Sequence, residues 1–204
     1  MGTRCVKDYV APDPVEPVID NTPKFDSIID ERDGQEYKTV KIGLQTWMAQ
    51  NLNFEYNNGS AQSSCYNDDP ENCEKYGRLY SWMAAIDSAG DFGSEKTGCT
   101  TDDVCGLTSV VGLCPKGFHL PDPKDWETLL AQVDKSDTLS LALRSTSDWS
   151  EERFNGTDEL GMNILPSGIY KGEEFSGIGE MTRFWTTNDN VKSATTGKSV
   201  GVST

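Results

Sequence analysis

The feature that most constrains the fold of this chain is a cysteine near the N-terminus, which a proline-rich segment separates from the rest of the sequence. Cys5 stands in residues 4–8, Arg-Cys-Val-Lys-Asp, a short strand-like run. Residues 9–24 follow, with acidic side chains and prolines at positions 12, 14, 17 and 23. Because proline lacks a backbone N–H, this segment cannot continue a helix or a central strand. The sequence predicts a displaced strand (1–8), a linker (9–24) and a folded domain (25–204).

Five further cysteines follow, at positions 65, 73, 99, 105 and 114. None of the six forms the Cys-x-x-Cys pair of zinc or thioredoxin-like redox sites, which favours disulfides formed in an oxidising compartment. The close spacing of Cys65 and Cys73 predicts one small disulfide-closed loop. The spacing of Cys99 and Cys105 predicts a second.

Charge and hydropathy exclude several classes of partner. The formal net charge of −15, from 33 acidic and 18 basic residues, repels nucleic acid and anionic lipid surfaces. No apolar run is long enough to cross a bilayer, and no signal segment follows Met1. His119 is the single histidine, so a hydrogen-bonded structural imidazole is favoured over a zinc ligand. We expect an extracellular or cell-surface protein whose signal segment is absent from this sequence.

Periodicity predicts two helices among short strands. Residues 37–42 alternate apolar and polar side chains, as a strand with one buried face does, and residues 45–48 complete a hairpin. Residues 51–74 are rich in Asn, Asp, Ser and Gly, which predicts irregular surface structure. The spacing of Leu79, Trp82, Met83 and Ile86 predicts a helix over residues 78–88.

The second helix has a clear start signal. Asp122 is a good N-cap and Pro123 suits the first helical position, and the apolar face runs on to Val133. A weaker helical pattern spans residues 139–144. Short strands are expected in the glycine-interrupted sequence that follows, at residues 160–166, 169–170, 183–187 and 198–204 and around Phe175.

Four motifs resemble those of one bacterial family. Residues 30–43 read DERDGQEYKTVKIG, and residues 46–53, 75–82 and 114–121 read TWMAQNLN, KYGRLYSW and CPKGFHLP. In this order they resemble the Fibrobacter succinogenes major paralogous domain, over residues 25–204. That family is similar to C-type-lectin-like folds and occurs in secreted or surface proteins. The resemblance implies an α+β, C-type-lectin-like fold with two helices, short antiparallel strands and long disulfide-closed loops.

The resemblance also gives Cys5 a partner. Family members typically finish with a strand resembling Ser-Val-Arg-Cys-Val-Lys-Asp, whose cysteine is placed to pair with the one in the Cys-Pro motif. Here that ending stands at residues 4–8 instead, and joining residues 200–204 to it would regenerate a family-like final strand. Residues 4–8 could end a preceding tandem repeat, complete the sheet of their own chain, or complete that of a neighbouring copy. The last two arrangements imply a Cys5–Cys114 disulfide.

The resemblance favours binding over catalysis. The related formylglycine-generating enzymes need two reactive cysteines in an exposed cleft, and no such thiol pair stands out here. No Ser-His-Asp set and no distinct carboxylate pair can be assembled either. We therefore expect a non-catalytic module that binds a glycan or a surface protein through loops of its C-terminal half. The alternative is an assembly module in which the Cys5 strand joins copies or repeats.

Seven residues are candidate ligand contacts. Asp158 and Glu159 supply hard oxygen ligands in a glycine-framed loop, so Ca²⁺ is a possible cofactor. The segment after Trp185 vaguely resembles a tryptophan-asparagine-aspartate element of calcium-dependent sugar-binding relatives, although a buried core ring is the stronger interpretation of Trp185 itself. The candidates are Asp158, Glu159, Tyr170, Glu174, Trp185, Asn188 and Asp189.

Overall fold

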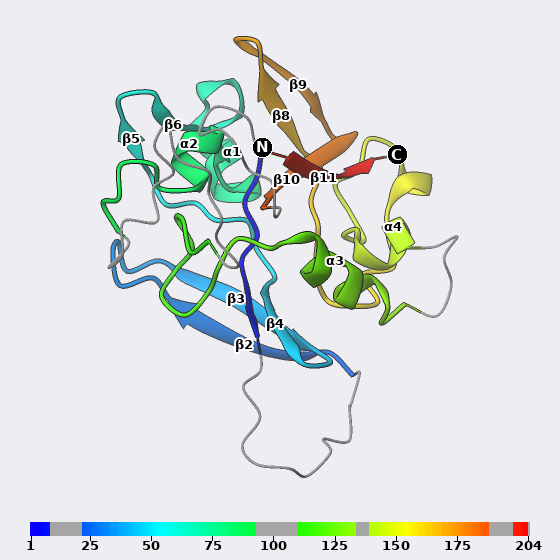
Figure 1. The fold of residues 1–204 in the computed structure, drawn as a ribbon. Coiled ribbons are helices and arrows are strands. Elements are labelled where there is room, and N and C mark those ends of the chain that lie inside the picture. Colours follow the sequence, from blue (N-terminus) through cyan, green and yellow to red (C-terminus); the bar gives the residue numbers. More distant parts are fainter. Residues whose placement is uncertain (9–21, 93–109, 134–138, 188–197, 204) are drawn as a thin grey trace, which may run out of the picture.

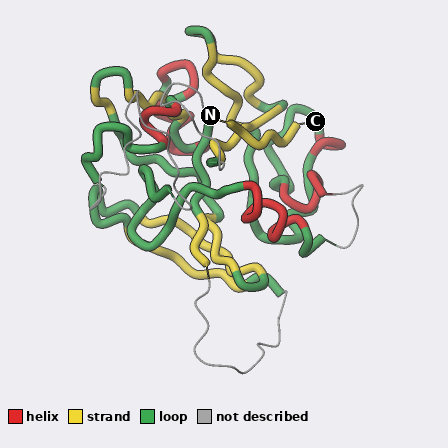
Figure 2. Tube along the Cα trace, viewed as in Figure 1, coloured by secondary structure: helices red, strands yellow, loops and turns green. Residues whose placement is uncertain are grey.

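The computed structural model of the chain describes residues 1–8, 22–92, 110–133, 139–187 and 198–203. Figure 1 shows a mixed α+β arrangement, and Figure 2 shows that loops connect most of its short helices and strands. Cys99, Cys105, Asn188 and Asp189 lie outside the described residues, so the predictions made for them are not addressed.

The first sheet has the strand order β1-β4-β3-β2 and is antiparallel throughout. Its strands are β1 (Val6–Asp8), β2 (Lys24–Ile29), β3 (Glu36–Ile42) and β4 (Gln45–Met48). The predicted hairpin of β3 and β4 is confirmed, and Gly43 has the positive φ of 56° that its tight turn requires. Val6, Trp47 and Val40 lie opposite one another across three strands, and form one buried row.

The N-terminal segment is part of the core. Residues 2–6 are buried, and β1 pairs with β4 of the same chain. Cys5 is bonded to Cys114, the pairing that the resemblance implied. The structure therefore corresponds to the arrangement in which the first strand completes its own sheet, while exchange between copies stays a prediction. In Figure 1 this segment runs down the centre of the molecule, from β10 to the first sheet.

The second sheet has the order β11-β10-β8-β9. Its strands are β8 (Ser167–Lys171), β9 (Glu174–Ile178), β10 (Met181–Thr186) and β11 (Lys198–Ser203). The expectation of purely antiparallel strands is wrong at one point, because β8 and β10 pair in parallel at Gly168 and Thr182. The strand predicted at residues 160–166 is also wrong: this stretch is a loop with positive φ at Gly161 and Asn163 and one bridge, from Ile164 to Arg144.

The chain ends do not form the continuous strand that joining residues 200–204 to residues 4–8 would give. Gly2 bonds through its N–H and C=O to Arg183 and Trp185 of β10. Backbone groups of successive strand residues point to opposite edges of a strand, so Arg183 and Trp185 direct theirs to the edge of β10 where Gly2 lies. Strand β11 pairs with β10 over its whole length and therefore lies along the other edge. The terminal segments thus occupy two separate places in the structure.

Four α-helices are present in the described residues, not two. The predicted second helix is α3 (Pro123–Leu130), in which Asp122 and Asp125 form a capping box, and it ends three residues before Val133. A short α4 (Leu139–Leu143) matches the weaker helical pattern. Helix α1 (Pro70–Tyr76) begins at the N-cap Asp69. It lies in a stretch predicted to be irregular.

The helix predicted over residues 78–88 is wrong at its start. Leu79 and Tyr80 form strand β7, and the helix is only α2 (Trp82–Ala85), capped by Ser81. Residues 79–80 form a strand rather than a helical turn because they pair with β6 (Ala61–Ser64), and because the Tyr80 N–H donates to the Met1 carbonyl. With β5 (Asn57–Asn58) these strands form a third sheet, so residues 51–74 are not merely irregular surface as predicted. This stretch also contains the predicted Cys65–Cys73 disulfide.

Two apolar clusters lie on opposite faces of the first sheet. Tyr37, Met48 and Cys5 belong to the cluster that also contains α2 and β7. Val40 and Trp47 belong to the other, with Trp126 of α3 and Phe184 of β10. The sheet and its N-terminal strand thus connect the two halves of the core.

Candidate functional site

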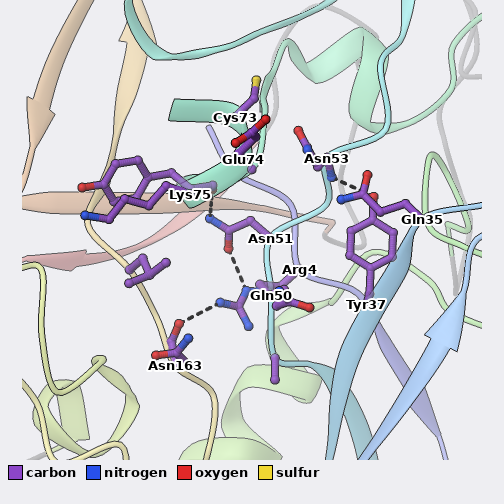
Figure 3. Close-up of a pocket in the computed structure, with 14 residues that line it drawn as sticks. Arg4, Gln35, Tyr37, Gln50, Asn51, Asn53, Cys73, Glu74, Lys75 and Asn163 are labelled. Atoms are coloured by element: carbon purple, nitrogen blue, oxygen red, sulfur yellow. Dashed lines mark hydrogen bonds between the residues drawn. The ribbon is translucent and has the colours of Figure 1, made fainter. Parts of the chain in front are cut away.

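The candidate site is a small polar pocket that Arg4 and four other segments of the chain enclose. It lies between the start of β3, residues 49–53, the C-terminal end of α1 and residues 163–165, and has a volume of about 190 Å³. Its polar lining is dominated by carboxamides around one buried arginine, as Figure 3 shows. These side chains are Arg4, Gln35, Gln50, Asn51, Asn53 and Asn163.

Arg4 places a guanidinium in the interior at the pocket, where the side chain is 1% exposed. Its Nη1 donates to the carbonyls of Met48 (2.7 Å) and Met162 (2.8 Å). Its Nε donates to Asn51 Oδ1 (2.7 Å), and Nη2 donates to the Asn163 carbonyl (3.2 Å). Four of the five guanidinium N–H groups are thus used, and the fifth has no partner in the part of the chain that the structure describes.

Burial and one carboxylate set the electrostatics around Arg4. Burial lowers the pKa of Arg4 to about 9, and the charge of Asp158 opposes that shift. Burial in turn raises the pKa of Asp158, against the N–H that Asn163 donates to its Oδ1 and the charge of Arg4. The guanidinium therefore remains a cation at neutral pH, held mainly by neutral oxygens.

Asn51 joins the N-terminal segment to helix α1. Its Oδ1 accepts from Arg4, and its Nδ2 donates to the Tyr76 carbonyl at 2.7 Å. The following residue, Gly77, has φ 73° and ψ −177° and lies against Asn51. A Cβ at Gly77 would lie 2.6 Å from Asn51 Cβ and 2.9 Å from the Leu52 carbonyl. This wall of the pocket therefore requires glycine at position 77.

Asn53 lines the pocket beside Tyr37 and carries an acceptor without a partner among the described residues. Its backbone N–H donates to the Tyr37 hydroxyl at 3.0 Å, which Figure 3 shows. Its Oδ1 is buried and accepts no hydrogen bond from any described residue. A buried polar atom without a partner costs about 1–3 kcal/mol, and because solvent does not reach this oxygen, a ligand could bond to it only after the Asn53 side chain turns toward the pocket.

The charged residues at the rim are mostly engaged. Lys75 forms an ion pair with Asp148, and that hydrogen bond is the largest cause of the raised pKa of Lys75. Glu74 is exposed and is the one carboxylate in the lining. The pocket therefore offers neutral hydrogen-bonding groups and one buried cation, with little free charge.

The candidate contacts predicted from the sequence do not converge. Asp158 lies beside Asn163, close to the pocket, and the neighbouring Glu159 is exposed. Tyr170 is on the β8–β9 hairpin and packs on Phe175, with its ring centroid 4.6 Å away. Glu174, also on that hairpin, is exposed.

Trp185 is a core-side residue rather than an open ligand platform. Its Nε1 donates to the Tyr80 carbonyl at 2.8 Å, and its ring packs on Trp82 with centroids 5.3 Å apart. The side chain is partly buried and packs against the first apolar cluster. This agrees with the stronger interpretation made from the sequence.

A second polar group surrounds the single histidine. Asp8, His119 and Asp125 each place one potential ligand atom within 4.8 Å of the others. However, Asp125 Oδ2 already accepts from the Asp122 N–H and lies 3.2 Å from His119 Nε2, while its Oδ1 accepts from Gln45. The Asp125 oxygens are thus engaged in the capping box and its neighbours.

The protonation of His119 is tied to these carboxylates. Burial alone would lower the pKa of His119, but the hydrogen bond to Asp125 and the charges of Asp125, Asp8 and Asp122 outweigh it, so the pKa is raised. The same residue bonds through its backbone to Val6 of β1 in both directions. His119 therefore links the N-terminal strand to the start of α3.

A family model described as the Fibrobacter succinogenes major domain matches residues 40–203. The chain belongs to this family. No curated protein and no solved structure was matched. The Fibrobacter succinogenes major domain match begins within β3, so it leaves out three residues of the pocket lining, Arg4, Gln35 and Tyr37.

Only a weak signal in the sequence pointed to this pocket. Residues 50–53 read QNLN within one of the family-like motifs, and they carry three of the five carboxamides. The placement of Arg4 was missed, although its neighbour Cys5 was linked to Cys114 by the resemblance. The Fibrobacter succinogenes major domain here thus has its central cation supplied by a segment outside the matched region.

Proposed function

We propose that this domain is a non-catalytic binding module that recognises a glycan, with one sugar unit held in the pocket at Arg4. The main support is the convergence of five carboxamide side chains and the buried guanidinium of Arg4 on one pocket. If the Asn53 side chain turns toward the pocket, a ligand hydroxyl can donate to its buried Oδ1 and remove the cost of leaving that oxygen unpaired.

Carboxamide side chains suit a polyhydroxylated ligand. Each one carries both donors and an acceptor, and each sugar hydroxyl also donates and accepts. The side-chain amides of Gln35 and Asn53 make no hydrogen bond to a described residue, and Gln50 uses only its Oε1, which accepts from the Lys38 N–H. These free amide groups can therefore be matched to hydroxyls without a change in the fold.

Pocket size limits the ligand. At about 190 Å³, the pocket is smaller than the ~300–1,000 Å³ typical of small-molecule sites. It suits a single sugar unit or a chain end better than an extended oligosaccharide. Residues 163–165 form one wall, so the C-terminal half contributes to binding, although by other residues than those predicted.

The proposal also covers the location of the protein, the kind of fold and the need for calcium. We place the protein outside the cytoplasm, secreted or at the bacterial cell surface, because disulfides persist in oxidising compartments. No helix in the described ranges is long and apolar enough to span a membrane. We also propose that the fold is of the C-type-lectin-like kind. Because Glu74 is the one carboxylate in the lining, binding at this pocket should not require Ca²⁺.

A glycan array, probed with Ca²⁺ and with chelator, tests the proposal. We expect binding under both conditions, and the sugars that bind should then be titrated by calorimetry. Asn53→Ala and Gln35→Ala should each weaken the affinity about 3–10-fold, the effect of one lost hydrogen bond. Gln62→Ala is the matched control, because Gln62 is exposed on β6 and does not line the pocket.

Two results would contradict the proposal. One is the absence of any bound glycan under both conditions, which would favour a surface protein as the ligand. The other is an affinity that Asn53→Ala and Gln35→Ala leave unchanged, which would place the binding site elsewhere on the domain.

A further inference from the structure

Strand β2 is an open edge of the first sheet. It pairs with β3 on one side, and in the described residues no strand pairs with its other side. Two hollows of about 710 and 630 Å³ flank it, and both are lined by Phe25, Asp26 and Ser27. An uncovered edge of this kind can accept a further strand.

The direction of the backbone groups follows from the ladder with β3. The Asp30 N–H donates to the Gln35 carbonyl at 2.8 Å, just beyond the last pair of the β2–β3 register. Hydrogen-bonded and non-hydrogen-bonded pairs alternate in an antiparallel ladder. Alternate residues of β2, at positions 24, 26 and 28, therefore bond to β3, whereas Phe25, Ser27 and Ile29 direct their N–H and C=O groups to the open edge.

Ser27 provides independent support for this direction. Its N–H donates to the carboxylate of the adjacent Asp26 at 2.9 Å, rather than to β3. That contact is exposed and local, so an incoming carbonyl can replace it.

Two of these three residues carry exposed apolar side chains. Phe25 and Ile29 are each 67% exposed, the highest values among the large apolar side chains of the described residues. They lie two positions before and two positions after Ser27, and side chains at that spacing share one face of the strand. Charged side chains would normally protect such an edge, yet Asp26 points to the other face.

We propose that β2 pairs with β2 of a second copy of this chain, antiparallel and about a two-fold axis through Ser27. In this register Phe25 of each copy lies opposite Ile29 of the other, so each exposed apolar side chain covers its counterpart. Ser27 lies opposite its own symmetry mate. The three residues of each copy whose backbone N–H and C=O groups point away from β3 then lie opposite the same three residues of the other copy. These backbone groups can therefore bond to one another across the two edges.

Neighbouring registers are less favourable. A shift that centres the axis on Asp26 pairs Phe25 with Ser27 and leaves Ile29 beyond the strand of the partner. A shift by one residue between the two strands would set outward-directed backbone groups against inward-directed ones. The register centred on Ser27 is therefore the one in which apolar cover and backbone bonding agree.

The dimer should be reversible. One short strand from each copy forms a small interface compared with the ~1,200–2,000 Å² of stable complexes. The net charge of −15 on each copy also opposes association, and salt screens that repulsion. We expect a dimer that forms as concentration rises and that salt strengthens.

Sedimentation equilibrium over a wide concentration range tests the association. The wild type should pass from monomer to dimer, and Ser27→Pro should stay monomeric. Proline removes an N–H that does not bond to β3, and edge strands accept it, so the unfolding midpoint should not fall. A wild type that is monomeric throughout would overturn the proposal. So would a dimer that Ser27→Pro leaves intact, as exchange of the Cys5 strand between copies would give.

Cysteine cross-linking tests the register. Opposite residues in a hydrogen-bonded antiparallel pair have Cα atoms about 5.5 Å apart, within disulfide range. Ser27→Cys should therefore give a covalent dimer on mild oxidation at a concentration where the wild type associates. Asp26→Cys is the matched control and should not, because Asp26 faces Ile28 of the other copy. Equal cross-linking of both variants, or none of Ser27→Cys, would overturn the register.

Discussion

The two disulfides of the described structure should contribute unequally to stability, because they close loops of very different length. Cys5 and Cys114 are separated by 109 positions, and Cys65 and Cys73 by 8. Loop-closure entropy then gives about 4.8 kcal/mol at 25 °C for the long loop and about 2.5 kcal/mol for the short one. Removal of the Cys5–Cys114 bond should therefore lower the unfolding free energy by about 2.3 kcal/mol more than removal of the Cys65–Cys73 bond.

Paired substitutions make the comparison clean, since no unpaired thiol of the removed bond is left to exchange. Cys5→Ala with Cys114→Ala is compared with Cys65→Ala and Cys73→Ala by urea unfolding without reductant. With a slope near 2 kcal/mol per molar urea, the first variant should unfold at a midpoint about 1 M below that of the second. The two slopes should be similar, which confirms that the midpoints can be compared.

Two outcomes would refute this reasoning. Equal midpoints would show that the N-terminal segment is held by its packing and not by the covalent link. A lower midpoint for the variant without Cys65 and Cys73 would reverse the order that loop length sets. A peptide map of the intact protein without reductant, in which Cys114 is free or bonded elsewhere, would remove the premise itself.

Three further predictions concern the pocket and its surroundings. Gly77→Ala should lower the unfolding free energy by about 1–3 kcal/mol, because its backbone conformation is almost exclusive to glycine and a Cβ would meet Asn51. Arg4→Lys should cost roughly 2–4 kcal/mol in the same measurement, since an ammonium cannot reproduce the fork of bonds to Met48 and Met162. His119→Gln should alter the dependence of stability on pH. The folded-state pKa of His119 is raised, so its contribution is complete below about pH 6.5 and is lost as pH rises through the folded pKa.

Control substitutions show whether the losses of stability come from the contacts named above or from any substitution of the same kind. Gly59→Ala also has a positive φ but no atom near its Cβ, so it should cost less than Gly77→Ala. Arg183→Lys changes an exposed arginine and should be nearly neutral. A stability difference between wild type and His119→Gln that stays constant from acid to alkaline pH would contradict the linkage.

Local sequence signals predicted the elements whose stability is local. The start of α3 was predicted because Asp122 and Pro123 are adjacent in the chain and cap the helix without distant help. The β3–β4 hairpin was predicted for the same reason, since the turn at Gly43 lies between its two strands. In both cases the residues that decide the structure lie within a few positions of one another.

Elements that depend on distant partners were missed. Leu79 and Tyr80 fit an apolar helical stripe, but their backbone bonds go to β6 and to Met1. The pocket is a stronger case, because it needs Arg4 to pass between residues 48–51 and residues 162–163. No periodicity in the sequence reports a contact over 158 positions, so the cation and its carbonyl partners could not be brought together in advance.

The central position of residues 2–6 also sets an order for assembly during synthesis. These residues are synthesised well before their partners, because Gly2 bonds to β10, whose residues are made about 180 positions later. The Cys5–Cys114 disulfide likewise cannot form until Cys114 has been synthesised, whereas Cys65 and Cys73 are made within a few residues of each other. Residues 2–6 are thus among the last parts of the fold to reach their place, and until then Cys5 is open to pairing with the wrong thiol.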